Sequence, residues 1–283
     1  MKSYLMITGA RGGLGSAFVL EAARRGFDLF LTDLSADGDA LSRQIAEQFQ
    51  INVIYRPCDL ADDNARESFL GGLKTEGFTF WGLINVAGLD HEGMFLEKSR
   101  SQILKILKVN VLSTTDVTHE ILQLRDPEKK FRLITVCSLA GFYPMPYKAT
   151  YAASKRFLLD MSRALREEIK DFGSVTALCP AGMPTTVECM RSIFAQGFWG
   201  MATSMNMDVV ARLTLKAALK GRGLVIPGFL NQMIHALSSL VPAELALKYV
   251  AKRWRKARAE VANSLILRET PVEPDRVSMA RPA

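Results

Sequence analysis

Short apolar runs alternate with longer amphipathic stretches along most of this chain. The runs have continuous apolar cores, which is typical of strands that are buried on both faces of a sheet. Seven such runs predict strands, at Tyr4–Ile7, Leu29–Thr32, Asn52–Tyr55, Gly82–Asn85, Arg132–Val136, Val175–Leu178 and Leu224–Ile226. The stretches between them, such as 36–49 and 62–75, have the apolar spacing of helices. This alternation predicts an α/β fold with a doubly wound, parallel sheet of about seven strands.

Composition and charge narrow the class of protein. Of the 283 residues, 48% are hydrophobic and 23% are charged, which excludes collagen-like, disordered and disulfide-dense chains. The four cysteines form no CxxC pair and no cluster with histidine at metal-ligand spacing, so we expect no metal site and a reducing, cytoplasmic location. Residues 243–283 hold nine Lys or Arg against five Asp or Glu, while the rest of the chain is nearly neutral. We therefore expect no nucleic-acid partner.

A turn rich in glycine joins the first predicted strand to the helix pattern that follows it. The turn reads Thr8-Gly9-Ala10-Arg11-Gly12-Gly13-Leu14-Gly15. Glycines at such a turn let the backbone approach a pyrophosphate, and the free N–H groups of the helix N-terminus attract its charge. We expect a dinucleotide site that is lined here by Gly9, Arg11, Gly13, Leu14 and Gly15. A plain loop is the alternative.

A carboxylate at the end of the second strand bears on the choice of dinucleotide. Asp33 lies 18 residues beyond Gly15, where it can accept hydrogen bonds from the ribose hydroxyls and repel the 2′-phosphate of NADP. The alternative role is an N-cap for the helix after Ser35. Arg11 favours NADP instead, because a cation in the turn attracts a phosphate. We expect NAD as the cofactor rather than NADP.

Ser138, Tyr151 and Lys155 form a second group of polar residues. Ser138 closes the fifth strand at the carboxyl edge of the sheet, where α/β proteins bind ligands. Tyr151 and Lys155 are four residues apart in a helical stretch, so they share one face. A nearby ammonium favours the phenolate and lowers the pKa of the tyrosine, which makes it a usable acid or base. The alternative for such a pair is a solvated helix face.

Taken together, these motifs resemble the short-chain dehydrogenase/reductase family. The resemblance covers roughly residues 3–228 and rests on the glycine turn, on Asn85-Val86-Ala87-Gly88, and on Asn110, Ser138, Tyr151 and Lys155. It implies a Rossmann-like fold and an enzyme that transfers a hydride between a nicotinamide dinucleotide and a secondary alcohol or ketone.

The resemblance also implies a role for each matching residue. Tyr151 is the implied general acid or base, and Lys155 lowers its pKa and holds the nicotinamide ribose. Ser138 bonds the substrate oxygen, and Asn110 holds a water in a proton relay. The other implied cofactor contacts are Asp59, Leu60, Asn85, Ala87, Gly88, Pro180, Gly182, Met183 and Thr185. Val86, Ala181 and Met183 depart from the family pattern, in which Asn, Gly and Val stand at these places.

Two alternatives of other classes fit these residues less well. A catalytically silent NAD-binding regulator on the same fold is expected to lack Tyr151 or Lys155, and this chain has both. The sugar-nucleotide epimerase branch has a tighter glycine spacing and a larger C-terminal substrate domain, and neither is seen here.

The stretch Met183–Met207 follows the sixth strand, where substrate specificity lies in this family. Its methionine and aromatic residues suit an adaptable apolar pocket or lid, with the core of a helical flap as the alternative. We expect a bulky hydrophobic secondary alcohol or ketone, such as a hydroxysteroid or bile acid. A 3-oxoacyl thioester is the alternative substrate.

The pattern changes after the seventh strand. Residues 223–243 contain no Asp, Glu, Lys or Arg, but Pro227, Gly228 and several polar residues interrupt them, so a helix is favoured over a membrane span. That helix would carry on one face Leu230, Ile234, Leu237 and Val241. We divide the chain into a dinucleotide-binding catalytic domain, a helical extension and a flexible tail, at 1–228, 229–262 and 263–283.

A second helix is expected after Pro242, with Trp254 among several lysines and arginines. A basic amphipathic helix can lie on an anionic membrane, so residues 243–258 are a candidate for peripheral membrane contact. The alternative is a helix that caps the pocket or packs on a partner subunit. The family resemblance implies a homodimer or homotetramer that pairs through the helices around Asn110 and Tyr151.

Overall fold

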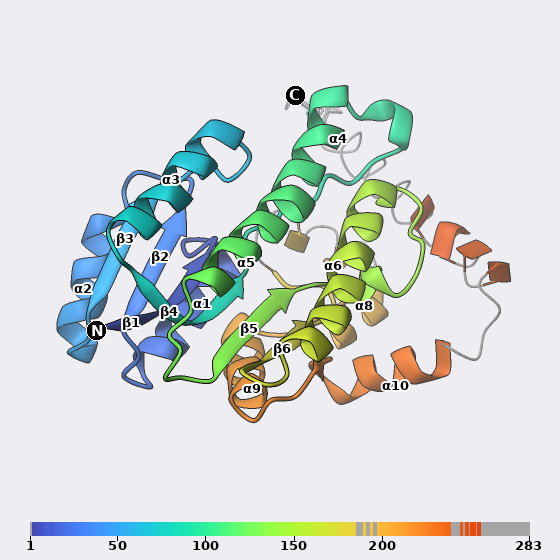
Figure 1. Ribbon diagram of the computed structural model, residues 1–283. Coiled ribbons are helices and arrows are strands. Elements are labelled where there is room, and N and C mark those ends of the chain that lie inside the picture. The colour runs from blue at the N-terminus through green and yellow to red at the C-terminus, as the bar shows by residue number, and fades with distance from the viewer. Residues whose placement is uncertain are drawn as a thin grey trace, which may run out of the picture.

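The computed structural model describes residues 2–184, 189–190, 193–194, 197–238, 244–245, 247–248, 250–252 and 254–255. They form a seven-stranded sheet with the strand order β3-β2-β1-β4-β5-β6-β7, and every pairing is parallel (Figure 1). Its strands are β1 (Ser3–Thr8), β2 (Leu29–Asp33), β3 (Val53–Pro57), β4 (Thr79–Asn85), β5 (Phe131–Val136), β6 (Gly173–Leu178) and β7 (Leu224–Val225). All seven predicted strands are confirmed, each within three residues of its expected ends.

Helices connect the strands and cover both faces of the sheet. The longer ones are α1 (Gly13–Ala23), α2 (Asp39–Phe49), α3 (Asp63–Thr75), α4 (Arg100–Leu107), α5 (Thr114–Gln123), α6 (Ala149–Glu168), α8 (Gly197–Thr203), α9 (Met207–Leu219) and α10 (Phe229–Ser238). Short helical turns are η1 (Phe95–Glu97), η2 (Lys108–Ser113) and η3 (Leu139–Gly141). Because η2 directly follows α4 and precedes α5, these three elements form one continuous helical rod.

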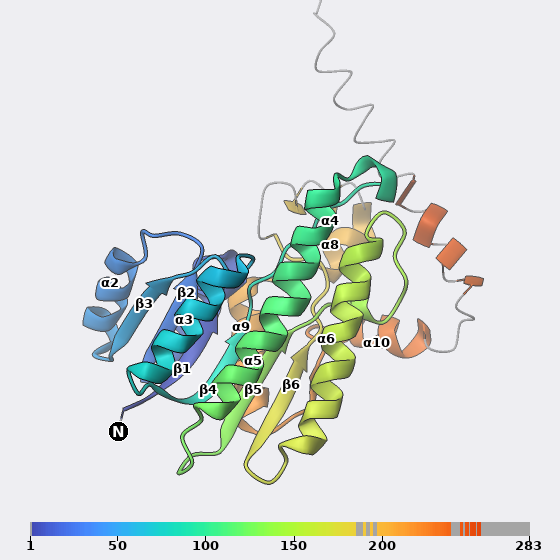
Figure 2. The same cartoon turned by 45° about the horizontal axis from the view of Figure 1, so that its top comes forward.

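Alternate residues of a strand face opposite layers of helices. In β1, Leu5 and Ile7 pack in a core with residues of α1 and α9, whereas Tyr4 and Met6 pack in a second core with residues of α3 and α5. Figures 1 and 2 show α3, α5 and α6 in front of the sheet and α9 behind it. The doubly wound fold is confirmed, and burial on both faces explains why the strands lack polar alternation.

The carboxyl ends of the central strands meet at one edge of the sheet. The register pairs Thr8 of β1 with Thr32 of β2 and with Asn85 of β4, and it pairs Val136 of β5 with Leu178 of β6. The loops that follow these residues therefore lie next to one another. A doubly wound sheet binds its ligands at this edge.

The helix expected after the last strand is α10, which contacts α8. Among the helices that the structure describes, none has both the length and the apolar composition of a bilayer-spanning segment. The tail predicted over 263–283 lies outside the described residues, as do several positions of the helix expected after Pro242.

Candidate active site

The glycine turn between β1 and α1 packs against the loop that follows β4. Gly9 has a φ of +64°, and a Cβ atom on it would lie 2.8 Å from the backbone N and Cα of Ala87. A Cβ atom on Gly15 would lie 1.9 Å from the carbonyl oxygen of Gly9. Only glycine fits at these two positions, where the close approach shapes the floor of the predicted dinucleotide site.

The N-terminus of α1 is open to an anion. Its N-cap is Gly12, which supplies no side chain to bond the first backbone N–H groups, and Gly13 follows it on the surface. Leu14 and Gly15 are buried beneath the turn. Free N–H groups at the positive end of a helix bind phosphate. The turn therefore fits the pyrophosphate of a dinucleotide.

Asp33 is held at the end of β2 by the glycine turn. Its carboxylate accepts hydrogen bonds from the backbone N–H of Arg11 (2.9 Å) and from that of Leu34 (2.8 Å). The helix that follows begins at Asp39 with Gly38 as its N-cap, so the alternative role of Asp33 as a helix cap is wrong. The Arg11 guanidinium donates to the Ser35 hydroxyl. An anionic and a cationic side chain thus lie together at this corner.

The pair Asp59-Leu60 follows β3 and is held by a buried arginine. Arg66 of α3 donates to the carbonyl of Leu60 (2.9 Å) and pairs with Asp116 of α5 (2.6 Å). The Asp59 carboxylate accepts from the N–H of Ala61 (2.9 Å). The sequence analysis did not identify Arg66 as a residue that fixes this loop. Its signal was weak, since an arginine near the start of a helix is usually solvated.

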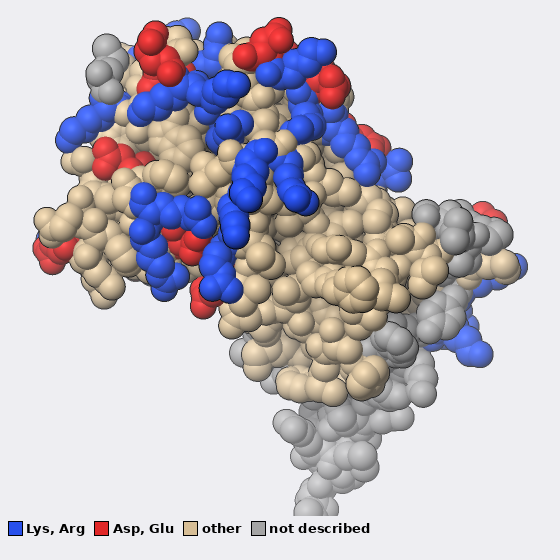
Figure 3. All heavy atoms as spheres, turned by 90° about the horizontal axis from the view of Figure 1, so that it is seen from below, with Lys and Arg blue, Asp and Glu red and all other residues tan. Residues whose placement is uncertain are grey.

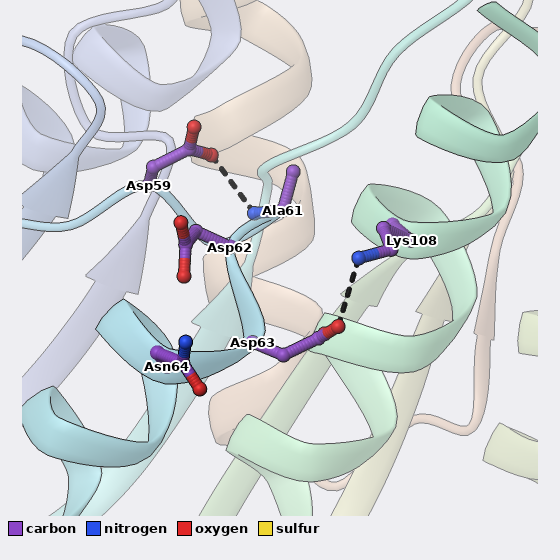
Figure 4. A pocket seen from close by; sticks show the side chains of 6 residues that line it. All are labelled: Asp59, Ala61, Asp62, Asp63, Asn64 and Lys108. Atoms are coloured by element: carbon purple, nitrogen blue, oxygen red, sulfur yellow. Dashed lines mark hydrogen bonds and ion pairs between the residues drawn. The ribbon is translucent and has the colours of Figure 1, made fainter. Parts of the chain in front are cut away.

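An open depression of about 410 Å³ lies beside this loop (Figure 4). Its lining residues are Asp59, Ala61, Asp62, Asp63, Asn64 and Lys108. Figure 4 shows the Asp63 carboxylate turned toward Lys108, at a distance of 2.8 Å. The lining is polar, so the depression suits the solvated edge of a nucleotide site better than an apolar substrate.

Residues after β4 join the glycine turn to the interior. Asn85 donates to the Thr118 hydroxyl of α5 (2.8 Å), which directs its amide into the protein. The backbone N–H groups of Val86 and Ala87 both donate to the Thr8 hydroxyl, at 3.1 and 3.3 Å. Having Val rather than Asn at position 86 therefore removes only a polar side chain, and the loop keeps its backbone anchor.

Asn110 lies in η2, a turn of π-helix, and is completely buried. Its amide Oδ1 accepts from the N–H of Leu89 (2.7 Å), and its Nδ2 donates to the Leu89 carbonyl (2.9 Å) and to the Ser154 hydroxyl (3.0 Å). Ser154 donates in turn to the carbonyl of Tyr151 (2.7 Å). Asn110 thus connects the loop after β4 to the helix that carries Tyr151. Its implied water contact stays a prediction.

Lys155 and Tyr151 lie on the face of α6 that meets the carboxyl ends of β4 and β5. The Lys155 ammonium donates to the carbonyl of Val136 (2.8 Å) and lies 5.7 Å from the centre of the Tyr151 ring. A Cβ atom on Gly88 would lie 3.4 Å from both the Lys155 Nζ and the Asn110 Oδ1. Gly88, Asn110 and Lys155 therefore meet beside the Tyr151 ring, and the solvated-face alternative is wrong for Lys155, which is buried.

The protonation of these two groups is shifted by burial. Burial raises the pKa of the Tyr151 phenol, the charge of Asp90 raises it further, and a hydrogen bond with the Ser138 hydroxyl acts in the opposite direction. Burial also lowers the pKa of Lys155. The protein alone therefore keeps the phenol protonated, and a cationic ligand beside it would favour the phenolate.

Ser138 closes β5 and also caps η3. Its hydroxyl accepts from the N–H of Ala140 (3.1 Å) and bonds the Tyr151 hydroxyl. The next residue, Leu139, donates its N–H to the carbonyl of Pro180 (3.0 Å). The loops after β5 and β6 are thereby joined beside the tyrosine.

The predicted contacts after β6 are described in part. Pro180 is buried, Gly182 approaches Ile193, and Met183 packs against the core shared with α1 and α9. Thr185 lies outside the described residues. In the stretch beyond it, Phe194 and Phe198 are exposed.

An ion cluster that the sequence analysis missed adjoins Tyr151. Lys148, just before α6, pairs with Asp90 and lies 3.5 Å from the Glu92 carboxylate. Its ammonium lies 5.8 Å from the centre of the Tyr151 ring. Burial alone would lower the pKa of Lys148, but the two carboxylates outweigh it and raise that pKa. Its place three residues before Tyr151 was the signal that could have identified it.

Trp254 reaches this cluster from the far end of the chain. The Lys148 ammonium lies 5.2 Å from the centre of the Trp254 ring, which is 7% exposed. Leu247, Val250 and Ala251 are also partly buried, whereas Lys248, Lys252 and Arg255 are exposed. Trp254 was expected as an interfacial side chain. Its burial beside Lys148 makes it a wall of the active-site region instead.

Comparison with known proteins places these features in a family. A sequence model of the family described as short chain dehydrogenase matches residues 3–193. A very-long-chain 3-oxoacyl-CoA reductase of Neurospora crassa is 32% identical over 190 residues, which is 65% of this chain and 57% of the relative. A protein of the same name from Bos taurus is 28% identical over 177 residues, or 61% and 56% of the two chains. The chain thus spans little more than half the length of the curated relatives it matches.

Solved structures show the same fold at low identity. A 7beta-hydroxysteroid dehydrogenase is similar with a TM-score of 0.76 and 20% identity, covering 88% of this chain and 96% of that one. A short-chain dehydrogenase from Sphingobium yanoikuyae in complex with NADPH has a TM-score of 0.67 and 21% identity, covering 99% and 98%. A short chain dehydrogenase/reductase from Burkholderia phymatum in complex with NAD has a TM-score of 0.64 and 20% identity, covering 80% and 89%.

Proposed function

Because this chain belongs to the short-chain dehydrogenase family, we propose that it is a nicotinamide-dependent oxidoreductase that interconverts a secondary alcohol and a ketone. The observation that supports this most strongly is the meeting of Asn110 and Lys155 at Gly88, with the Tyr151 ring 5.7 Å from the Lys155 ammonium and Ser138 bonded to the Tyr151 hydroxyl. The presence of both Tyr151 and Lys155 argues against a catalytically silent regulator.

The dinucleotide, when bound, supplies or accepts the hydride. The open N-terminus of α1 and the close packing of Gly9 and Gly15 fit its pyrophosphate. Ser138 and Tyr151 offer two hydroxyls that bind the substrate oxygen from one side. In reduction the Tyr151 hydroxyl gives its proton to that oxygen, and in oxidation the phenolate takes the proton back.

Lys155 and Asn110 serve this proton transfer in different ways. The Lys155 ammonium holds positive charge within one side-chain length of the phenol, which stabilises the phenolate while the proton is away. Asn110 acts through structure, since its amide fixes the Leu89 backbone and, through Ser154, the turn of α6 that carries Tyr151. Both tasks are positioning and charge placement, the main source of rate in such a site.

For the substrate, we propose the 3-oxoacyl thioester of a long acyl chain. Support comes from the curated relatives, whose name gives a very-long-chain 3-oxoacyl-CoA substrate. The apolar side chains beyond β6 and the Trp254 wall also suit a long hydrocarbon. A steroid or bile acid, which the sequence favoured, is supported only by the apolar residues. The similarity to a hydroxysteroid dehydrogenase lies in the fold and says nothing about the substrate.

A spectrophotometric screen tests this assignment. NADH or NADPH oxidation is followed at 340 nm with 3-oxoacyl thioesters of increasing chain length, and the reverse reaction with steroids and bile acids. We expect the largest kcat/KM with a long 3-oxoacyl thioester. A steroid or bile acid turned over with the larger kcat/KM would reverse the choice of substrate, and no turnover of any ketone would reject the oxidoreductase.

NAD is the proposed cofactor, because the Asp33 carboxylate lies at the end of β2 and repels a 2′-phosphate. Arg11 opposes this preference from the other side of the same corner. We expect Asp33→Ser to raise the ratio of NADP to NAD activity by roughly tenfold and Arg11→Ala to lower it, since each removes one charge that a 2′-phosphate would meet. The ratio of kcat/KM for the two dinucleotides measures both effects.

A homodimer or homotetramer is proposed as well. The rod of α4 and η2 exposes Leu104, Leu107 and Leu112, and α6 exposes Phe157. An apolar surface of this kind favours a subunit contact. Sedimentation velocity tests it: Leu104→Ser combined with Leu107→Ser should shift the parent assembly toward monomer. A monomeric parent would remove the proposal.

A further inference from the structure

Helix α10 is attached to the protein by its polar side chains. Asn231 is 2% exposed and donates to the carbonyls of Pro227 (2.8 Å) and Thr203 (3.1 Å). Gln232 donates to the carbonyl of Ile226 (2.8 Å). One turn later, His235 lies 3.0 Å from the Tyr143 hydroxyl through its Nδ1 and stacks on Phe142, with ring centres 4.0 Å apart. Asn231 and His235 thus lie on the inward face of this helix, and the exposed Gln232 adds a hydrogen bond at its start.

Four apolar side chains of α10 are exposed, whereas Leu230 is half-buried. Phe229 is 77% exposed and Leu237 is 59% exposed, and Met233 and Ile234 between them are exposed as well. These positions recur at i, i+4, i+5 and i+8 and so share one stripe of the helix. An ordinary surface helix buries such a stripe and exposes its polar face. In α10 the arrangement is reversed.

The chain before this stripe carries charge of one sign. From residue 209 to residue 243 the sequence has no Asp or Glu, and it has four cations, Arg212, Lys216, Lys220 and Arg222. All four are exposed. Both α9 and α10 lie along the lower side of the molecule in Figure 1, and the view from below in Figure 3 shows a broad uncharged face with many Lys and Arg side chains, and some Asp and Glu, along one side of it.

We propose that the outer face of α10 docks on the surface of an anionic lipid bilayer, with Phe229, Met233 and Leu237 among the acyl chains. The cations of α9 and of the turn before β7 would then meet the lipid headgroups. This combination of an apolar stripe and flanking positive charge is what an interfacial helix uses. Trp254 is buried beside Lys148 and so does not insert.

A second copy of this chain fits the face less well. A two-fold contact would place the same patch on both subunits, so Lys216 and Lys220 would meet like charges across the interface. The apolar surface of α4 and η2 is the better candidate for a subunit contact. An anionic bilayer, in contrast, complements both the apolar stripe and its charged border.

Docking would also serve the substrate, a point that rests on the proposed function. Through His235 and Tyr143, α10 is tied to the segment that follows Ser138. A bilayer against α10 therefore lies beside an element that reaches the active site. An acyl substrate dissolved in that bilayer would then enter the active site from the membrane side.

Co-sedimentation with vesicles tests the docking without any turnover. The full chain is mixed with vesicles of phosphatidylglycerol and phosphatidylcholine, or of phosphatidylcholine alone. We expect binding to the anionic vesicles. The partition coefficient should fall about tenfold on neutral vesicles, which lack the anionic headgroups, and about tenfold in about 0.5 M salt, which screens the attraction between the cations and those headgroups.

Variants separate this face from the rest of the surface. Phe229→Ser combined with Leu237→Ser should lower the partition coefficient by about tenfold, since both side chains leave the acyl region. Phe95→Ser combined with Leu96→Ser removes two exposed apolar side chains elsewhere, in η1, and should leave it within about twofold of the parent. Thermal unfolding checks that both variants keep the parent fold. All four residues are exposed, so neither change opens a cavity.

Each outcome decides the proposal. Parent protein that stays in the supernatant with anionic vesicles overturns it, as does an equal loss in both double variants. A Phe229→Ser and Leu237→Ser variant that changes the sedimentation coefficient in the absence of lipid assigns the face to a subunit contact instead. Because binding is measured on protein alone, a failure here is distinct from a failure to find turnover.

Discussion

The catalytic body and the chain that follows β7 use their polar residues differently. In the body, buried polar groups such as Asn110 and Lys155 lie where several loops meet, and apolar stripes face the core. In α10 the polar groups attach the helix, and the apolar stripe faces outward. The difference teaches that hydrophobic periodicity identifies a helix but does not say which face is inward. We therefore expect changes in the body to abolish function and changes near the C-terminus to alter it by degrees.

The sharpest test of the body is Tyr151→Phe. The change removes the proton that reaches the substrate oxygen and leaves the ring in place. We expect kcat to fall by at least about a thousandfold, because general acid–base catalysis contributes on this scale. NADH affinity, measured by fluorescence titration, should stay within about twofold, since the ring that packs there is kept.

Tyr143→Phe is the matched control for this loss. Its hydroxyl bonds His235 of α10. Turnover in this variant should stay close to the parent value. A Tyr151→Phe enzyme with activity within tenfold of the parent would contradict the proposed role of the phenol.

Gly15→Ala should come next in size. Its added methyl group would lie 1.9 Å from the Gly9 carbonyl oxygen, so the floor of the dinucleotide site must shift. We expect the dissociation constant for NADH to rise by about a hundredfold and the free energy of unfolding to fall by about 1–3 kcal/mol, the usual cost of overpacking.

Gly71→Ala provides the comparison, because Gly71 lies in α3 with open space where its Cβ would be. Alanine favours a helix by up to about 1 kcal/mol over glycine, so this variant should be slightly more stable and bind NADH normally. Equal losses in the two variants would show that the site has no special need for glycine at position 15.

Asp90 and Lys148 should shift the pH dependence in opposite directions. In the oxidative direction the phenolate accepts a proton, so the rate rises with pH through the pKa of Tyr151. The negative charge of Asp90 raises that pKa. Asp90→Asn should therefore move the acidic limb of the kcat profile to lower pH, by about one unit.

Lys148→Met leaves Asp90 and Glu92 without their cation, so it should move the same limb to higher pH. The two variants serve as controls for each other, because a general loosening of the loop would move both profiles the same way. Shifts of equal sign would argue against an electrostatic role for this cluster.

Trp254→Ala should have the smallest effect and the most selective one. The change removes the wall beside Lys148, and we expect KM for long-chain substrates to rise about threefold to tenfold with kcat nearly unchanged, since the apolar wall contributes about 1 kcal/mol to binding. Short substrates should be unaffected. Trp81→Ala, at a ring packed 4.7 Å from Phe27, should lower stability without changing the dependence on chain length.

Much of this molecule could be predicted from its sequence. The strands are continuous apolar runs because both faces of the sheet are covered. The glycine turn, Ser138, Tyr151 and Lys155 come at spacings that a doubly wound sheet requires. Each of these features depends on residues that are close together in the chain, so a short stretch of sequence is enough to predict it.

The rest depends on contacts between distant segments. Nothing near Trp254 indicates that it meets Lys148, which is more than a hundred residues earlier. The roles of Arg66 and Asn110 likewise come from partners on other elements. For Tyr151, the sequence predicted a lowered pKa from a neighbouring lysine, whereas burial and Asp90 raise it in the folded protein. The four-residue spacing indicates that the lysine is near the tyrosine, but it does not indicate how strongly burial disfavours the charged phenolate.

The π-helical turn of η2 has a consequence for insertions and deletions in this chain. It adds a residue to the rod of α4 and α5 and brings Asn110 to face Leu89. Deleting that extra residue would return η2 to plain α-helix and keep the facing of α5, whereas deleting a residue of α5 before Val117 would turn every later position by about 100°, since an α-helix has 3.6 residues per turn. Val117 and Ile121 would then leave the core between helix and sheet. A change of one residue that the wide turn of η2 absorbs would therefore, a few residues later, separate α5 from the strands beneath it.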